Sequence, residues 1–221
     1  MSCSPPHSST QPGLPRRSAA KPGAAVPHCI AEAREGREGS IVALEAPRRA
    51  TAAVLGELAP VLLRGERELY CVDGGNCFDP YGFAVYARKR KADAGQMLER
   101  IFVTRAFTIH QLEAVAAEML PPLATRRPPP MLAILGLDHL FLEETLPLAE
   151  RRQVLERILM RLKRLRARHM TMLVTYDPPL RGRAWWRPLL LDAADRRGHV
   201  AQGRDGEVEV RLGAEVLAIG R

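Results

Sequence analysis

The 221-residue chain carries no segment that predicts a membrane span and no recognisable export signal. No apolar run approaches the roughly 18 residues that a transmembrane helix needs. The pair Arg16-Arg17 is followed by Ser-Ala-Ala-Lys-Pro instead of the apolar region of a signal peptide. We therefore expect a cytoplasmic protein with no membrane partner.

Cysteine and histidine are too irregularly spaced to predict a metal site. The four cysteines include no Cys-x-x-Cys pair, which argues against a zinc site and against a disulfide framework. Three histidines are scattered along the chain without the spacing of metal ligands, and we predict structural roles for them: His110, His139 and His169.

Acidic residues are outnumbered by basic ones. Lys and Arg total 33 and Asp and Glu total 25, so the formal net charge is +8. This balance favours phosphate-rich or acidic partners, but a basic surface that is merely solvated stays open as an alternative. The 46% of hydrophobic residues are enough for a sizeable core in one domain.

The first 38 residues lack apolar periodicity and are rich in Pro, Ser, Gly, Ala and Arg. Such a segment cannot bury enough apolar surface to offset the entropy of ordering it. We predict a disordered N-terminal tail over residues 1–38 and one folded domain over residues 39–221.

Beyond the tail, short apolar runs alternate with longer helical patterns. This alternation predicts an α/β fold, with a mostly parallel sheet flanked by helices on both faces. A C-terminal β-hairpin is predicted to turn at Arg204-Asp205-Gly206. Pro121-Pro122 is predicted to close the helix over residues 110–119. The expected strands cover residues 40–44, 68–73, 101–105, 131–138 and 170–176, and the expected helices cover residues 51–63, 82–91, 94–100, 110–119, 147–169 and 187–194.

The strand predicted over residues 131–138 ends in the carboxylate of Asp138, which is the Walker B arrangement. At the carboxyl end of a central parallel strand, such a side chain lies where ligands bind in open α/β sheets, and it could hold magnesium through water. Many buried strands also end in Asp, so a structural role stays open.

Several segments resemble, in the same order, the RecA-family recombinases and their paralogues. The segments are Tyr70 to Tyr81, Leu98 to Leu112, Leu148 to Gln153, and Val174-Thr175. In the first segment Asp73, Asp79 and Pro80 match the family pattern, but Gly75 stands where the family has its water-activating Glu. The resemblance covers about residues 40 to 180 and implies a RecA-like fold.

The phosphate loop that this resemblance implies is degenerate. Residues 41–51 contain no glycine and no lysine, although a phosphate loop uses both to surround and neutralise phosphates. Pro47 and two arginines, Arg48 and Arg49, replace them. Thr51 could be the remnant of the magnesium ligand and Arg49 could hold a phosphate, so weak binding of ATP with magnesium stays open, but we expect no catalytic residues.

A second candidate site follows the strand predicted over residues 170–176. In the family the corresponding region contributes a DNA-contacting loop, and this stretch combines arginines with two tryptophans. These residues could grip DNA through phosphate contact and base stacking, or the tryptophans could cap the core instead. The candidates are Arg181, Arg183, Trp185, Trp186 and Arg187. The basic runs in the long helix and at Arg88-Lys91 are interpreted as solvated surface.

The resemblance therefore implies a non-catalytic RecA-like accessory protein that assists DNA recombination or repair. Its partners would be single-stranded or double-stranded DNA, a recombinase, or a homologous paralogue. One alternative is an atypical active ATPase, in which Arg48, Arg49 and Thr51 hold phosphate while Asp138 orients magnesium. Another is a protein-interaction or regulatory subunit with no role in DNA binding.

Overall fold

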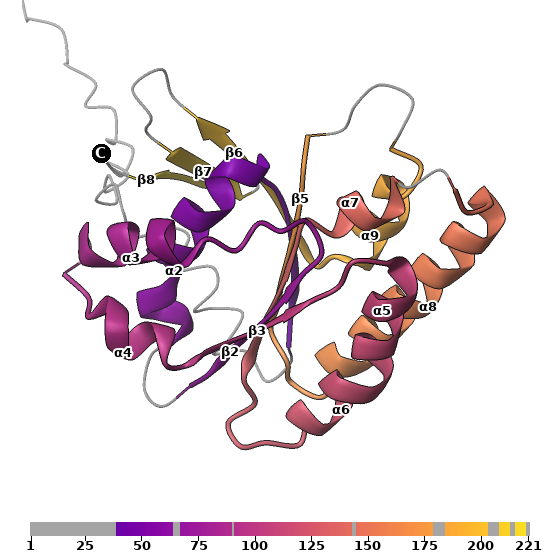
Figure 1. Ribbon diagram of the computed structural model, residues 1–221, viewed down its shortest axis with the longest axis horizontal. Helices are drawn as coiled ribbons and strands as arrows, with labels where there is room; N and C mark the ends of the chain where they lie inside the picture. Colours follow the sequence, from indigo (N-terminus) through magenta and orange to yellow (C-terminus); the bar gives the residue numbers. More distant parts are fainter. Residues whose placement is uncertain are drawn as a thin grey trace, which may run out of the picture.

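An eight-stranded sheet organises the computed structural model, which describes residues 39–63, 67–89, 91–142, 145–178, 184–202, 208–212 and 215–219. The strand order is β3-β2-β4-β5-β1-β6-β7-β8 (Figure 1). The predicted tail and the predicted turn at residues 204–206 lie outside the described residues. The strands are β1 (Ile41–Glu45), β2 (Leu69–Asp73), β3 (Ile101–Arg105), β4 (Met131–Leu135), β5 (Met172–Tyr176), β6 (Arg196–Gln202), β7 (Val208–Leu212) and β8 (Glu215–Ile219).

The six strands from β3 to β6 in this order pair in parallel, whereas β7 pairs antiparallel with both β6 and β8. The central strands β4 and β5 are buried along their whole length and read as continuous apolar runs, as strands covered on both faces do. The predictions of an α/β fold and of a mostly parallel sheet are thus confirmed. The hairpin itself stays a prediction, because its turn is not described.

Helices cover both faces of the sheet (Figure 1). Side chains alternate along β1, so that Val42 and Leu44 join the core on one face while Ile41 and Ala43 join the core on the other. The first face is covered by α2 (Thr51–Leu62), α3 (Pro80–Lys89) and α4 (Ala94–Leu98). The second face is covered by α5 (Ile109–Ala114), the π-helical turn η2 (Val115–Met119), α6 (Leu120–Leu123), α7 (Leu137–Phe141), α8 (Leu148–Arg166) and α9 (Arg187–Ala193).

The long helix α8 shows why periodicity predicted the covering layer. Its buried residues recur at three- and four-residue steps, so they form one stripe that packs against the sheet. The stripe consists of Val154, Leu155, Ile158, Leu159, Leu162 and Leu165. Each of these residues is at most 5% exposed.

Several predicted boundaries differ from the structure by a few residues, and two of the differences have a clear local cause. The strand predicted to end at Asp138 ends at Leu135, because Gly136 adopts a left-handed conformation (φ 61°) and starts the short helix α7. The helix predicted to close before Pro121-Pro122 continues as α6 to Leu123. Both prolines lie in the first turn of α6, directly after the π-helical residues Val115–Met119.

No helix in the described ranges is both long enough and apolar enough to cross a membrane.

Candidate ligand-binding cleft

At the carboxyl ends of the central strands, the helices that follow switch from one face of the sheet to the other. β1 and β2 lead into helices on one face, whereas their neighbours β5 and β4 lead into helices on the opposite face. Loops that leave adjacent strands in opposite directions open a crevice, and open α/β sheets bind ligands there. A cleft of about 870 Å³ lies at this place, and the segments after all four strands line it.

The segment after β1 enters the cleft as a tight turn and not as an open loop. Pro47 has no N–H, and residues Arg48–Ala50 form a 3-10 turn that leads into α2. The Arg48 N–H donates to Asp177 Oδ1 (2.7 Å), and the Ala50 N–H donates to the Pro47 carbonyl (2.7 Å). The Thr51 N–H donates to the Arg48 carbonyl. Three backbone donors that could surround a phosphate, those of Arg48, Ala50 and Thr51, are therefore engaged within the protein.

The four residues predicted to hold nucleotide do not all reach the cleft. Arg48, Arg49 and Asp138 line it. Thr51 is 1% exposed, and its hydroxyl oxygen finds no hydrogen-bond partner among the described residues. Thr51 therefore does not line the cleft in this conformation, and its role as a remnant magnesium ligand stays a prediction.

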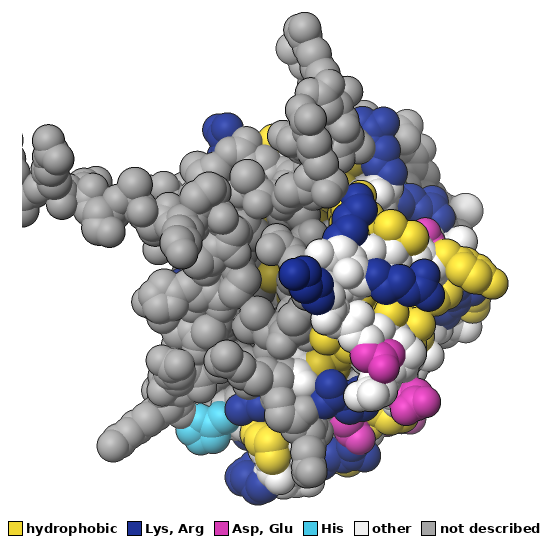
Figure 2. Space-filling view, turned by 90° about the vertical axis from the view of Figure 1, so that its left-hand side faces the viewer, with side chains coloured by type: hydrophobic (Ala, Val, Ile, Leu, Met, Phe, Trp, Pro, Cys, Tyr) yellow, Lys and Arg dark blue, Asp and Glu magenta, His cyan; other side chains and the backbone are white. Residues whose placement is uncertain are grey.

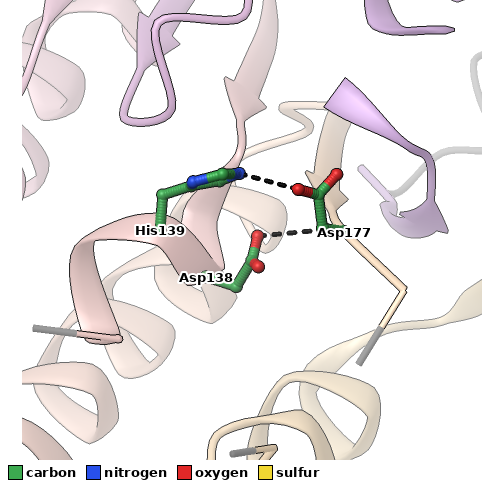
Figure 3. Close-up of side chains that lie close together, drawn as sticks. All are labelled: Asp138, His139 and Asp177. Atoms are coloured by element: carbon green, nitrogen blue, oxygen red, sulfur yellow. Dashed lines mark hydrogen bonds and ion pairs between the residues drawn. The ribbon is translucent and has the colours of Figure 1, made fainter. Parts of the chain in front are cut away.

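Asp138, His139 and Asp177 meet at the base of the cleft (Figure 3). Asp138 and His139 lie in the first turn of α7, and Asp177 follows β5 directly. The Asp177 N–H donates to Asp138 Oδ1 (3.1 Å), and His139 Nε2 lies 3.0 Å from Asp177 Oδ2. Ligand atoms of the three side chains lie within 4.8 Å of one another.

Burial shifts the pKa of two groups at the cleft. It raises the pKa of the Asp138 carboxyl, and the N–H donated by Asp177 opposes that rise. Burial, reinforced by the nearby Asp73 carboxylate, raises the pKa of the Cys77 thiol to about 12. Cys77 therefore stays a protonated thiol near neutral pH and is no nucleophile.

The loop after β2 approaches the loop after β4 so closely that only glycine fits at position 75. A Cβ atom on Gly75 would lie 2.6 Å from Cys77 Sγ and 3.0 Å from His139 Cδ2. Nearby, the buried Asp73 carboxylate accepts the N–H groups of Cys77 (2.8 Å) and Phe78 (3.1 Å) and so holds the loop. A glutamate at position 75 could not replace this glycine without moving one of the two loops.

The residues predicted to bind DNA do not form a surface in the described part of the chain. Trp186 is 2% exposed and packs edge-on against Tyr176, so its ring offers no face for a base. Trp185 packs edge-on against Phe141. Arg187 Nη2 lies 2.8 Å from Glu45 Oε2 in an ion pair. Arg181 and Arg183 lie outside the described residues.

For the tryptophans, the alternative in which they cap the core agrees with this packing. The predicted stacking of a base on Trp186 does not fit this structure, because the Trp186 ring is buried. Among the described residues, several basic side chains of α8 form ion pairs with acidic side chains. These ion pairs fit the interpretation of a solvated face.

The sequence alone did not single out His139 or Asp177. His139 was predicted to be structural because histidine spacing along the chain shows no ligand pattern, yet it directly follows Asp138. Asp177 directly follows an apolar strand, and this was the same signal that identified Asp138. What brings them together is the pairing of β4 with β5, which sets the segments after the two strands side by side.

Comparison with protein-family models and with curated proteins finds no match to this chain.

Proposed function

We propose that this chain is a non-catalytic RecA-like accessory protein that assists DNA recombination or repair by binding DNA, a recombinase partner, or both. The observation that carries the proposal is the turn after β1, whose backbone donors are engaged by Asp177 and by the turn itself. With three of its backbone donors engaged, and with neither glycine nor lysine, the segment lacks the usual means to hold the phosphates of ATP for hydrolysis.

The sheet offers a surface for a protein partner along β3. This strand pairs only with β2 among the described strands, so its outer side is open for pairing. Phe102 on β3 is 43% exposed, and Phe107 just after the strand is 71% exposed. Apolar side chains beside an open strand edge are typical of surfaces that bind another chain.

The support for DNA binding comes from net charge and not from one built surface. The chain has a formal charge of +8. Figure 2 shows that, on the described part of the face carrying α3 and α4, basic side chains are scattered among hydrophobic and acidic ones. Scattered positive charge supports DNA binding that depends on salt concentration and not on the base sequence of the DNA.

The first experiment measures equilibrium binding of labelled ATP with magnesium, followed in the same sample by binding of single-stranded DNA across a salt series. We expect no ATP binding, and DNA binding that weakens as salt rises. Replacing Thr51 and Asp138 together by alanine should leave DNA binding unchanged.

ATP binding that disappears in Asp138→Ala would contradict the proposal and favour an atypical ATPase, for which Arg48, Arg49 and Asp138 already line one cleft. In one triple variant, alanine replaces Arg181, Arg183 and Arg187. In a charge-matched control, alanine replaces Arg152, Arg157 and Arg166. Loss of DNA binding in the first variant but not in the control would assign the DNA contact to the predicted segment. Equal losses would trace the contact to net charge alone.

A further inference from the structure

Two carboxylates and one imidazole converge on one point of the cleft. The ligand atoms of Asp138, His139 and Asp177 all lie within 4.8 Å of one another, and Figure 3 shows the imidazole of His139 directed at the Asp177 carboxylate. The cluster is assembled from two different strand ends, so its members are brought together by the fold and not by adjacency in the sequence alone.

We propose that Asp138, His139 and Asp177 form a binding site for a divalent first-row transition-metal ion such as Zn²⁺ or Mn²⁺. This role goes beyond the accessory function and does not depend on it. An imidazole nitrogen combined with carboxylate oxygens suits these ions, whereas Mg²⁺ prefers ligand sets made of oxygen alone.

The distances suit a shared ion. His139 Nε2 and Asp177 Oδ2 lie 3.0 Å apart. Two ligand atoms at that separation can bind one ion through bonds of about 2.0 to 2.2 Å. In the structure these two atoms form a hydrogen bond, and an ion that binds both of them would replace it.

Both carboxylates are oriented by backbone groups, as the ligands of a metal site usually are. The Asp177 N–H holds Asp138 Oδ1 (3.1 Å), and the Arg48 N–H holds Asp177 Oδ1 (2.7 Å). The second bond leaves Asp177 Oδ2 on the side of His139. Each orienting bond comes from a different segment of the cleft wall, so the site depends on the folded arrangement of three loops.

The position of the cluster gives an ion access to solvent and to further ligands. Asp138 is 3% exposed, whereas the side chains of His139 and Asp177 are 26% and 31% exposed toward the cleft. Arg48 and Arg49 line the same cleft. A bound ion would therefore have coordination positions open to water, and two guanidinium groups nearby would favour an anion as its additional ligand.

The bare backbone of Gly75 belongs to the same arrangement. A Cβ atom at this position would approach the His139 ring to 3.0 Å at Cδ2. Glycine thus leaves room for the His139 imidazole, as it also does for Cys77 Sγ, which would lie 2.6 Å from that Cβ atom. The His139 contact is one of the reasons why position 75 has no room for a side chain.

The test is calorimetric titration of Zn²⁺, Mn²⁺ and Mg²⁺ separately into the full chain, after treatment with a chelator and without nucleotide or DNA. We expect one Zn²⁺ or Mn²⁺ ion per chain and weaker binding of Mg²⁺. The visible spectrum of bound Co²⁺ gives a second readout that reports ligand type. His139→Gln should weaken Zn²⁺ binding by roughly tenfold or more.

The matched control is His110→Gln, because His110 Nε2 also faces a carboxylate (Glu150 Oε1, 3.3 Å) but belongs to no three-ligand cluster among the residues that the structure describes. This variant should bind Zn²⁺ like the unchanged chain. If His139→Gln fails to fold by circular dichroism, Asp177→Asn takes its place, since the amide oxygen can still accept the Arg48 N–H. Equal Zn²⁺ affinity in the unchanged chain and the cleft variants would overturn the proposal. So would absence of Zn²⁺ and Mn²⁺ binding, or Mg²⁺ binding as tight as theirs.

Discussion

Gly75 is the position where two loops of the cleft leave no room for a side chain. The neighbouring atoms belong to buried or hydrogen-bonded groups, namely Cys77 Sγ, the His139 ring and the Gly136 backbone. Gly136 itself has a φ of 61°, a conformation that disfavours residues with a Cβ atom. The contact between the two loops therefore depends on both glycines.

Replacing Gly75 by alanine should lower the free energy of unfolding by about 1–3 kcal/mol, because the added methyl group must displace buried neighbours. Urea unfolding followed by circular dichroism measures the change. Gly95→Ala is the control: Gly95 lies within α4, and a Cβ atom added there would have Asp93 Oδ1 at 3.3 Å as its nearest neighbour. Alanine at this position should be neutral or stabilising by up to about 1 kcal/mol. A neutral Gly75→Ala would show that the loops separate easily.

At the scale of elements, α5 and α8 are joined by a cluster of three charged residues. The carboxylate of Glu113 accepts two hydrogen bonds from Arg157 (2.6 and 3.0 Å) and one from Arg161 (3.0 Å). The hydrogen bond from Arg157 is the largest cause that lowers the pKa of Glu113, to about 2. Because the folded pKa lies below the unfolded one, this pairing stabilises the fold at neutral pH and ceases to do so as the pH falls toward 2.

A titration followed by NMR should find the pKa of Glu113 near 2, well below its ordinary value near 4.5. In a variant with Arg157→Gln and Arg161→Gln the pKa should return toward the ordinary value, and the acid-unfolding midpoint should move to higher pH. The single variant Arg152→Gln serves as the control, since Arg152 forms its ion pair within α8 with Glu156 and not with Glu113. An unchanged Glu113 pKa in the double variant would assign the shift to another cause.

Elements were predictable where the pattern of burial is simple. The stripe of α8 and the apolar runs of β4 and β5 appear in the sequence because one face, or the whole strand, is buried. The end of β4 was not predictable from apolar character, since Leu137 is buried in α7 just as it would be in a strand. The turn depends on the left-handed Gly136, and the apolar pattern shows only that the residues are buried.

The candidate site was predicted only in part, because its members are related by the sheet. Arg48, Arg49 and Asp138 were identified from local motifs, and all three line the cleft. His139 and Asp177 were not identified, because their proximity follows from the pairing of β4 with β5. Thr51 was identified by its motif position, but packing buries its hydroxyl.

At the scale of the whole molecule, the open edge at β3 determines the prediction about assembly. If the proposed partner is a recombinase, replacing Phe102 and Phe107 together by lysine should weaken binding of the purified recombinase of the same organism by about 2 kcal/mol or more, because charge would replace apolar contact area. Surface plasmon resonance measures the affinity. Met160→Lys is the control, since Met160 is 47% exposed on α8, away from this edge. Full binding by the double variant would exclude β3 as the partner surface.

The place of β1 in the sheet affects how the chain must be made. β1 is the first strand along the described chain, yet both of its neighbours, β5 and β6, come from the last third of the sequence. During synthesis the apolar residues of β1 are made well before either neighbour exists, so the middle of the sheet can close only after β5 and β6 have been made. Nascent chains that stop before residue 172 would therefore leave β1 without either of its partner strands.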